Sequence, residues 1–175
     1  MKLTPMMEKY ILHWGEMGTR WGVNRTVAQI HALLYLSVSP LNAEEITETL
    51  GVARSNVSTS IKELQSWKLV KVVHLLGDRR DHFETMKDPW DLFDTIMEGR
   101  KQRELDPTIT LLRECVLDSD QDRETPESVK KRIKEVLGFM ETLDTWYGQI
   151  KGLPRSTLVK LIKLGAKVQG LVGRK

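Results

Sequence analysis

One stretch, residues 42–86, constrains the fold more than any other, because its pattern changes from helical to extended within a short distance. Asn42 is a good helix N-cap, and Glu45 stands three residues later, as a capping box requires. This spacing predicts a short helix over 43–50. A tight turn and a second helix over 54–67 follow, and the second helix carries three apolar residues on its inward face: Val57, Ile61 and Leu64.

The segment after these helices has the pattern of a β-hairpin. Residues 69–76 (LVKVVHLL) predict a strand, residues 77–81 (GDRRD) a polar turn, and residues 82–86 the returning strand. Helix, turn, helix and hairpin in this order form a winged helix-turn-helix. We therefore expect a mostly α-helical fold with a small β-hairpin wing and with helical dimerisation elements at both ends.

Helical spacing on either side of this stretch sets the expected domain organisation. Residues 1–24 are expected to form an N-terminal helix that contributes to dimerisation, residues 25–87 the winged helix-turn-helix domain, and residues 88–175 a helical dimerisation region. Asp88 followed by Pro89 is typical of a helix start, with aspartate as the cap and proline at the first helical position. Later pairs predict a kink or restart at Asp106-Pro107 and a helix start at Thr125-Pro126.

Two apolar stripes, one near each end of the chain, predict a homodimer. The first recurs at steps of three and four residues and contains Met7, Tyr10, Trp14 and Met17. The second keeps a period of about 3.5 residues, which is typical of a coiled-coil seam. Its members are Val129, Ile133, Val136, Met140, Leu143, Tyr147 and Ile150. We expect both stripes to pair across a twofold axis.

A polar surface for duplex DNA is predicted on the second helix and on the hairpin. The second helix of a helix-turn-helix lies in the major groove, where asparagine matches adenine and arginine matches guanine. The outward residues near its start are Arg54, Ser55, Asn56, Ser58, Thr59 and Lys62. At the hairpin tip, Arg79 and Arg80 are placed to reach a minor groove or phosphates. Taken singly, a polar helix face or an arginine-containing turn is more often a solvent-exposed surface without DNA contacts. Together, and in this order along the chain, the two features favour DNA binding.

Motifs in the same stretch carry a family resemblance. They are SNVS at 55–58, SIKEL at 60–64, WKLV at 67–70, GDRRDHFE at 77–84 and KDPW at 87–90. With them the chain resembles the MarR superfamily, and specifically its GbsR group. The resemblance implies a dimeric repressor or regulator whose recognition helix and wing contact DNA. Members of the group are associated with genes for uptake or synthesis of glycine betaine, and some of them have choline as effector. Ala53 departs from the pattern, because many relatives have a Ser or Thr cap there.

Five tryptophans invite a second binding hypothesis. An aromatic box for a quaternary ammonium such as choline, held by cation–π attraction, would consist of Tyr10, Trp14, Trp21, Trp146 and Tyr147. Aromatic stripes at this spacing are more often dimer core, so both interpretations stay open.

Other signals exclude several classes of function. A single cysteine, Cys115, permits no intrachain disulfide, and the four histidines show no metal spacing, so no metal or cofactor is expected. Without a phosphate-binding glycine loop or a nucleophile elbow the chain is not expected to be an enzyme. It lacks a signal peptide and an apolar run of about 20 residues, so we expect a cytoplasmic protein with no membrane partner.

The sequence thus predicts a dimeric, sequence-specific transcriptional regulator, acting as a repressor on a near-palindromic operator in duplex DNA. The net charge is only +3, and the middle of the chain is acidic while its ends are basic, which fits a protein that presents part of its surface to DNA. The alternative is a winged-helix module that binds protein partners without specific DNA binding.

Overall fold

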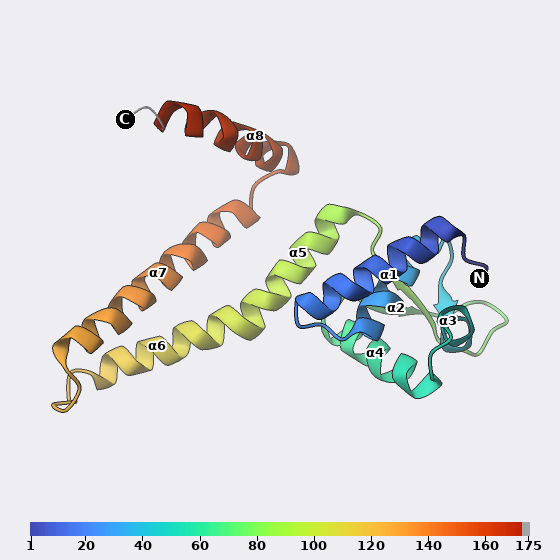
Figure 1. The fold of residues 1–175 in the computed structure, drawn as a ribbon, viewed down its shortest axis with the longest axis horizontal. Coiled ribbons are helices and arrows are strands. Elements are labelled where there is room, and N and C mark those ends of the chain that lie inside the picture. Colours follow the sequence, from blue (N-terminus) through green and yellow to red (C-terminus); the bar gives the residue numbers. More distant parts are fainter. Residues whose placement is uncertain (173–175) are drawn as a thin grey trace. The chain divides into compact units, whose positions relative to one another are not determined.

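The computed structural model describes residues 1–172, with side chains through residue 164, and it forms two compact units that divide after Gly99 (Figure 1). The first unit is helical with a small sheet, so the predicted fold class is confirmed. Its elements are α1 (Pro5–Arg20), α2 (Arg25–Leu36), β1 (Leu41–Asn42), α3 (Ala43–Leu50), α4 (Arg54–Ser66), β2 (Val70–Val73), β3 (His82–Thr85) and α5 (Pro89–Arg100).

Helix α2 is the centre of the first unit. Its Ile30 and Leu33 are fully buried and share one core with apolar residues of α3, α4 and the sheet. Removing this apolar surface from water is the main stabilising contribution to the unit. Helix α1 packs on α2 at close range: a Cβ added to Gly18 would lie 2.5 Å from the Ala28 Cβ, so only glycine fits there.

The predicted capping box is confirmed at the start of α3. Asn42 Oδ1 accepts hydrogen bonds of 3.0 Å from the Glu44 and Glu45 backbone N–H groups, and Glu45 Oε2 accepts one of 2.8 Å from the Asn42 N–H. The helix ends at Gly51, whose φ of +63° lies in the left-handed region that glycine tolerates. Helix α4 follows without a side-chain cap, because Ala53 has no acceptor to offer.

The sheet is antiparallel in the order β1-β3-β2, with Val70 opposite Thr85 and Val73 opposite His82. The hairpin is as predicted, but its first strand ends at Val73 and not at Leu76, since the backbone leaves the ladder there and Leu76 is fully exposed. Strand β1 was not predicted, because two residues are too few to show an alternating pattern.

Helix α5 belongs to the first unit, although the expected domain boundary was at residues 87–88. Its start is as predicted: Asp88 Oδ1 accepts a 2.7 Å hydrogen bond from the Trp90 N–H. Leu92 and Ile96 then pack against the buried core, and a Cβ on Gly99 would lie 2.7 Å from the Trp67 ring. These contacts, together with those of α1, make residues 1–99 one packed unit.

The second unit contains a π-helical turn, η1 (Lys101–Leu105), followed by α6 (Asp106–Asp118), α7 (Glu127–Lys151) and α8 (Arg155–Val172). The backbone restarts as α-helix at Asp106, where Pro107 has no N–H for a helical hydrogen bond. Helix α7 begins one residue later than predicted: Pro126 occupies the cap position, and no side chain caps the helix. Residues 173–175 of the predicted dimerisation region lie outside the described residues.

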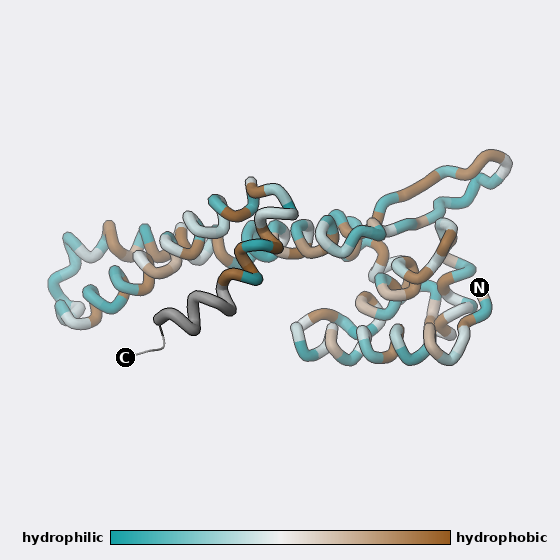
Figure 2. Tube along the Cα trace, turned by 90° about the horizontal axis from the view of Figure 1, so that it is seen from above, coloured by the Kyte–Doolittle hydropathy of each residue, from teal (hydrophilic) through white to brown (hydrophobic). Residues whose placement is uncertain are grey.

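Helices α6 and α7 pack against each other, and ion pairs flank their contact. Lys101 Nζ lies 2.9 Å from Asp144 Oδ1, and Arg113 Nη2 lies 2.7 Å from Glu141 Oε1. Hydrophobic positions recur along these helices between hydrophilic ones (Figure 2). None of the helices in the described part of the chain is long and apolar enough to cross a membrane.

Candidate nucleic-acid interface

Helix α4 has one buried face and one polar face. Val57, Ile61 and Leu64 are at most 3% exposed and fix the helix to the core. With about 100° of rotation per residue, most of the intervening positions point away from that core, while Ser60 is buried with it. All six residues that were predicted to contact bases or phosphates are exposed on α4: Arg54, Ser55, Asn56, Ser58, Thr59 and Lys62.

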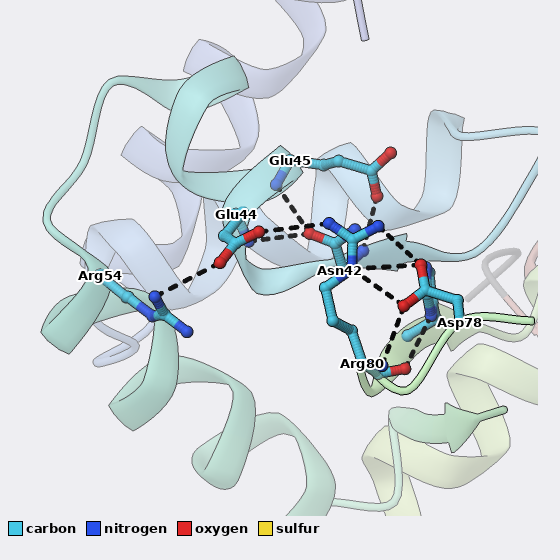
Figure 3. Close-up of polar contacts among 7 residues, drawn as sticks. Asn42, Glu44, Glu45, Arg54, Asp78 and Arg80 are labelled. Atoms are coloured by element: carbon cyan, nitrogen blue, oxygen red, sulfur yellow. Dashed lines mark hydrogen bonds and ion pairs between the residues drawn. The ribbon is translucent and has the colours of Figure 1, made fainter. Parts of the chain in front are cut away.

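The wing turn is held by Asp78 and Arg80 (Figure 3). Arg80 Nε donates to Asp78 Oδ1 over 3.0 Å and Nη2 to Oδ2 over 2.6 Å, while the Arg80 backbone N–H donates to Oδ1 over 3.0 Å. These bonds hold the pKa of Asp78 well below its usual range. The side chain of Asp78 therefore stays ionised and braces the turn.

Glu44 connects the wing to the recognition helix. Its Oε2 accepts from Arg80 Nη1 at 3.2 Å, and its Oε1 lies 3.4 Å from Arg54 Nη1. Three elements, α3, α4 and the wing, thus share one network of charges (Figure 3). Sequence reasoning missed Glu44, because its partner Arg80 is 36 residues away and no periodic signal links the two.

The two wing arginines, to which the sequence assigned one role, differ in their surroundings. Arg80 directs Nε and both terminal nitrogens to Asp78 or Glu44. Arg79 is exposed and forms no ion pair within the described residues. An arginine already engaged by two carboxylates must exchange a partner to bind a phosphate, and of the two wing arginines Arg79 is the one without such partners among the described residues.

The root of the wing is fixed to α2 through the side chains of Lys87 and Thr85. Lys87 Nζ donates to the backbone oxygens of Ser37 over 2.7 Å and Tyr35 over 3.0 Å, so it satisfies carbonyl groups at the C-terminal end of α2. The Thr85 hydroxyl donates to Leu69 O over 2.6 Å and accepts from His31 Nε2 at 3.1 Å. Burial, and then the charge of Lys87, lower the pKa of His31 to about 4, so His31 is neutral near pH 7.

Aromatic side chains form a row on α1 and its C-terminal end. The ring centroids of Tyr10 and Trp14 are 5.9 Å apart, and those of Trp14 and Trp21 are 6.4 Å apart. Trp14 is 38% and Trp21 56% exposed, while Met7 and Met17 are half-buried beside them. The row contains three members of the predicted aromatic box; the other two, Trp146 and Tyr147, lie on α7 in the second unit.

The predicted seam on α7 divides into two sets. Ile133, Met140, Tyr147 and Ile150 are half-buried, whereas Val129, Val136 and Leu143 are exposed. Phe139 and Trp146, 62% and 58% exposed, extend the exposed set at the same spacing of three and four residues. The spacing of Phe139 and Trp146 is visible in the sequence, but it was not recognised because only one apolar seam was expected on this helix. One side of α7 faces α6, and an apolar stripe remains uncovered.

Metal chemistry has no candidate site here: among the described side chains no three His, Cys, Asp or Glu residues gather as ligands. Cys115 is half-buried on α6.

Comparisons with known proteins agree with the winged helix-turn-helix geometry. A family model described as "MarR family" matches residues 21–81. The HTH-type transcriptional repressor GbsR of Bacillus subtilis (strain 168) is 23% identical over 139 residues, which cover 78% of this chain and 77% of the relative. The putative HTH-type transcriptional regulator YvaV of the same organism is 21% identical over 69% of this chain and 72% of its own length.

A crystal structure of a transcriptional regulator has the same fold. It superimposes with a TM-score of 0.66 at 15% sequence identity, over 85% of this chain and 97% of the other. The family model covers α2, α3, α4 and the wing up to Asp81, and of these α3, α4 and the wing form the polar surface described above. These comparisons support a DNA-binding transcriptional regulator that is similar to GbsR and to the MarR superfamily.

Proposed function

We propose that this protein is a homodimeric, sequence-specific repressor that acts in the cytoplasm on a near-palindromic operator. The observation that carries the proposal is the two-faced recognition helix: α4 is anchored by Val57, Ile61 and Leu64 and exposes hydroxyl, amide and cationic groups on its other side. Such a helix enters the major groove with its first turns. Repression is supported by the similarity to a relative that is named a repressor.

Specific reading is assigned to the start of α4 and positioning to the wing. Asn56 pairs with adenine and Arg54 with guanine, while Ser55, Ser58, Thr59 and Lys62 approach the backbone. Arg79 reaches the flanking minor groove. Arg80 contributes mainly by holding the wing, since its guanidinium is engaged by Asp78 and Glu44.

Dimerisation is assigned to the apolar surfaces of α1 and α7. Trp14 on α1 and Val136, Phe139 and Leu143 on α7 are all more than a third exposed. Covering them with a second copy removes apolar area from water. A dimer of this kind presents two recognition helices about 34 Å apart, one turn of DNA.

The effector assigned to the protein is a quaternary ammonium such as choline, in line with the resemblance to the GbsR group and its genes of glycine betaine metabolism. Tyr10, Trp14 and Trp21 supply neighbouring ring faces for cation–π attraction. Titration of tryptophan fluorescence with choline tests this assignment. A fluorescence change with altered operator affinity is expected, and no change in either would contradict it.

Binding to a labelled fragment of the protein's own promoter, compared with unrelated DNA from about 50 to about 300 mM salt, tests the proposed function. We expect a preference for the promoter fragment of about a thousandfold or more at physiological salt. Equal, weak and steeply salt-dependent binding to both fragments would contradict it and would favour a protein-binding winged helix.

A further inference from the structure

Glu44 lies in the middle of the polar surface that α4 and the wing present (Figure 3). One carboxylate oxygen is 3.4 Å from Arg54 Nη1, and the other is 3.2 Å from Arg80 Nη1. Its side chain is 48% exposed, so its charge acts on whatever approaches this surface. A carboxylate at this place repels DNA phosphates, which the two arginines beside it attract.

The two arginines that flank Glu44 differ in how many of their guanidinium nitrogens are already engaged. Arg54 is 72% exposed and gives one terminal nitrogen to Glu44; its remaining N–H groups have no partner among the described residues. Arg80 has all three guanidinium nitrogens engaged. Because a guanidinium is a rigid fork of five donors, holding Arg54 by one nitrogen orients the free edge without occupying it.

We propose that Glu44 is a specificity-determining residue, which weakens binding to unrelated DNA and positions Arg54 for a guanine base edge. The inference rests on the proposed function. Binding to unrelated DNA depends on phosphate contacts, so the carboxylate opposes it directly. At the operator the oriented Arg54 gains a bidentate contact with a base, and this contact offsets the repulsion.

The substitution Glu44→Gln tests this, because it removes the charge and keeps the size of the side chain. We expect affinity for unrelated duplex to rise about five- to tenfold, and its salt dependence to steepen by about one phosphate contact. Operator affinity is expected to change by less than about twofold, so discrimination falls about five- to tenfold. Both fragments are measured with the full chain, and the melting temperature is recorded for each variant.

Glu48→Gln is the matched control. Glu48 is exposed on the same helix and undergoes the same change of charge, but within the described residues it forms no ion pair with Arg54 or Arg80. This variant is expected to keep the wild-type discrimination. A general effect of net charge would instead change both variants alike and would overturn the proposal.

Making Glu44→Gln in a protein that already carries Arg54→Ala separates a positioning role of Glu44 from a structural one. Because Glu44 is proposed to act through its own charge and also through Arg54, Glu44→Gln is expected to lose part of its effect on discrimination in this background, and an undiminished effect would overturn the positioning role. If the wild-type protein prefers its operator and Glu44→Gln discriminates equally well, the role of Glu44 is overturned while the proposed function stands. A wild-type protein without any operator preference would overturn the proposed function and this inference together.

Discussion

The two units of the chain differ in how far they bury their apolar residues. In residues 1–99 a continuous core holds α1 to α4, the sheet and α5 together, and α4 keeps its polar face outside this core. In the second unit, among side chains through residue 164, Ile109 is the one fully buried hydrophobic residue, while Phe139 and Trp146 are mostly exposed. The first unit buries an extended core of its own and exposes the polar face of α4. The second offers apolar surface that a partner can cover.

The largest expected effect concerns this uncovered surface. The double substitution of Val136 and Leu143 by Glu places charges in the exposed stripe of α7, where burial in a dimer would be costly. We expect monomers and a loss of operator affinity of about a hundredfold, because two half-sites are no longer bound together. Sedimentation equilibrium and operator binding are the measurements.

Lys134 and Thr145, exposed on α7 outside this stripe, provide the control when both are replaced by Glu. The control should remain dimeric. A dimeric Val136→Glu, Leu143→Glu protein with full operator affinity would show that the second unit does not pair through α7.

The next effect concerns the stability of the first unit. Lys87→Met removes the donor that satisfies carbonyl groups at the end of α2, and we expect the free energy of unfolding to fall by about 2 kcal/mol. Thermal and urea denaturation measure it. Lys71→Met, at an exposed ion pair with Glu84, should cost less than about 1 kcal/mol. Equal losses in the two variants would contradict the role of Lys87.

A third, smaller effect sharpens the difference between the two wing arginines. Arg79→Ala is expected to weaken binding to operator and unrelated DNA alike, about five- to tenfold, and to flatten the salt dependence by about one phosphate contact. Arg80→Ala is expected to loosen the wing and to raise the pKa of Asp78 toward its usual value, since its main partner is lost. Identical salt slopes for Arg79→Ala and the wild type would contradict the assignment of Arg79.

The smallest effect is a pH dependence within the first unit. The pKa of His31 is about 4 in the folded protein, below its ordinary value of 6.5, so folding favours the neutral ring. The stability that depends on the neutral ring is complete above pH 6.5 and is lost as the pH falls toward 4. Denaturation across this range should show a shallower decline for His31→Gln. The same change at His74, whose side chain is 80% exposed, should leave the decline unaltered.

The local patterns in the sequence predicted most of the fold. Capping at Asn42, the glycine stop at Gly51 and the proline start at Pro89 depend on neighbouring residues, so the sequence alone shows them. The strand end at Val73 and the attachment of α5 depend on tertiary contacts, so they could not be predicted. The same division holds at the site: the exposed face of α4 follows from helical spacing, whereas the engagement of Arg80 by Glu44 requires the fold.

Footprinting of the promoter DNA is the decisive test of operator recognition by a dimer through α4, with wild-type protein beside Asn56→Ala, a change on the exposed face of α4 that leaves the core intact. We expect two protected half-sites, related by twofold symmetry and about 34 Å apart, which weaken together in the variant. Unprotected DNA with a folded, dimeric wild-type protein, or protection that Asn56→Ala leaves unchanged, would contradict such recognition.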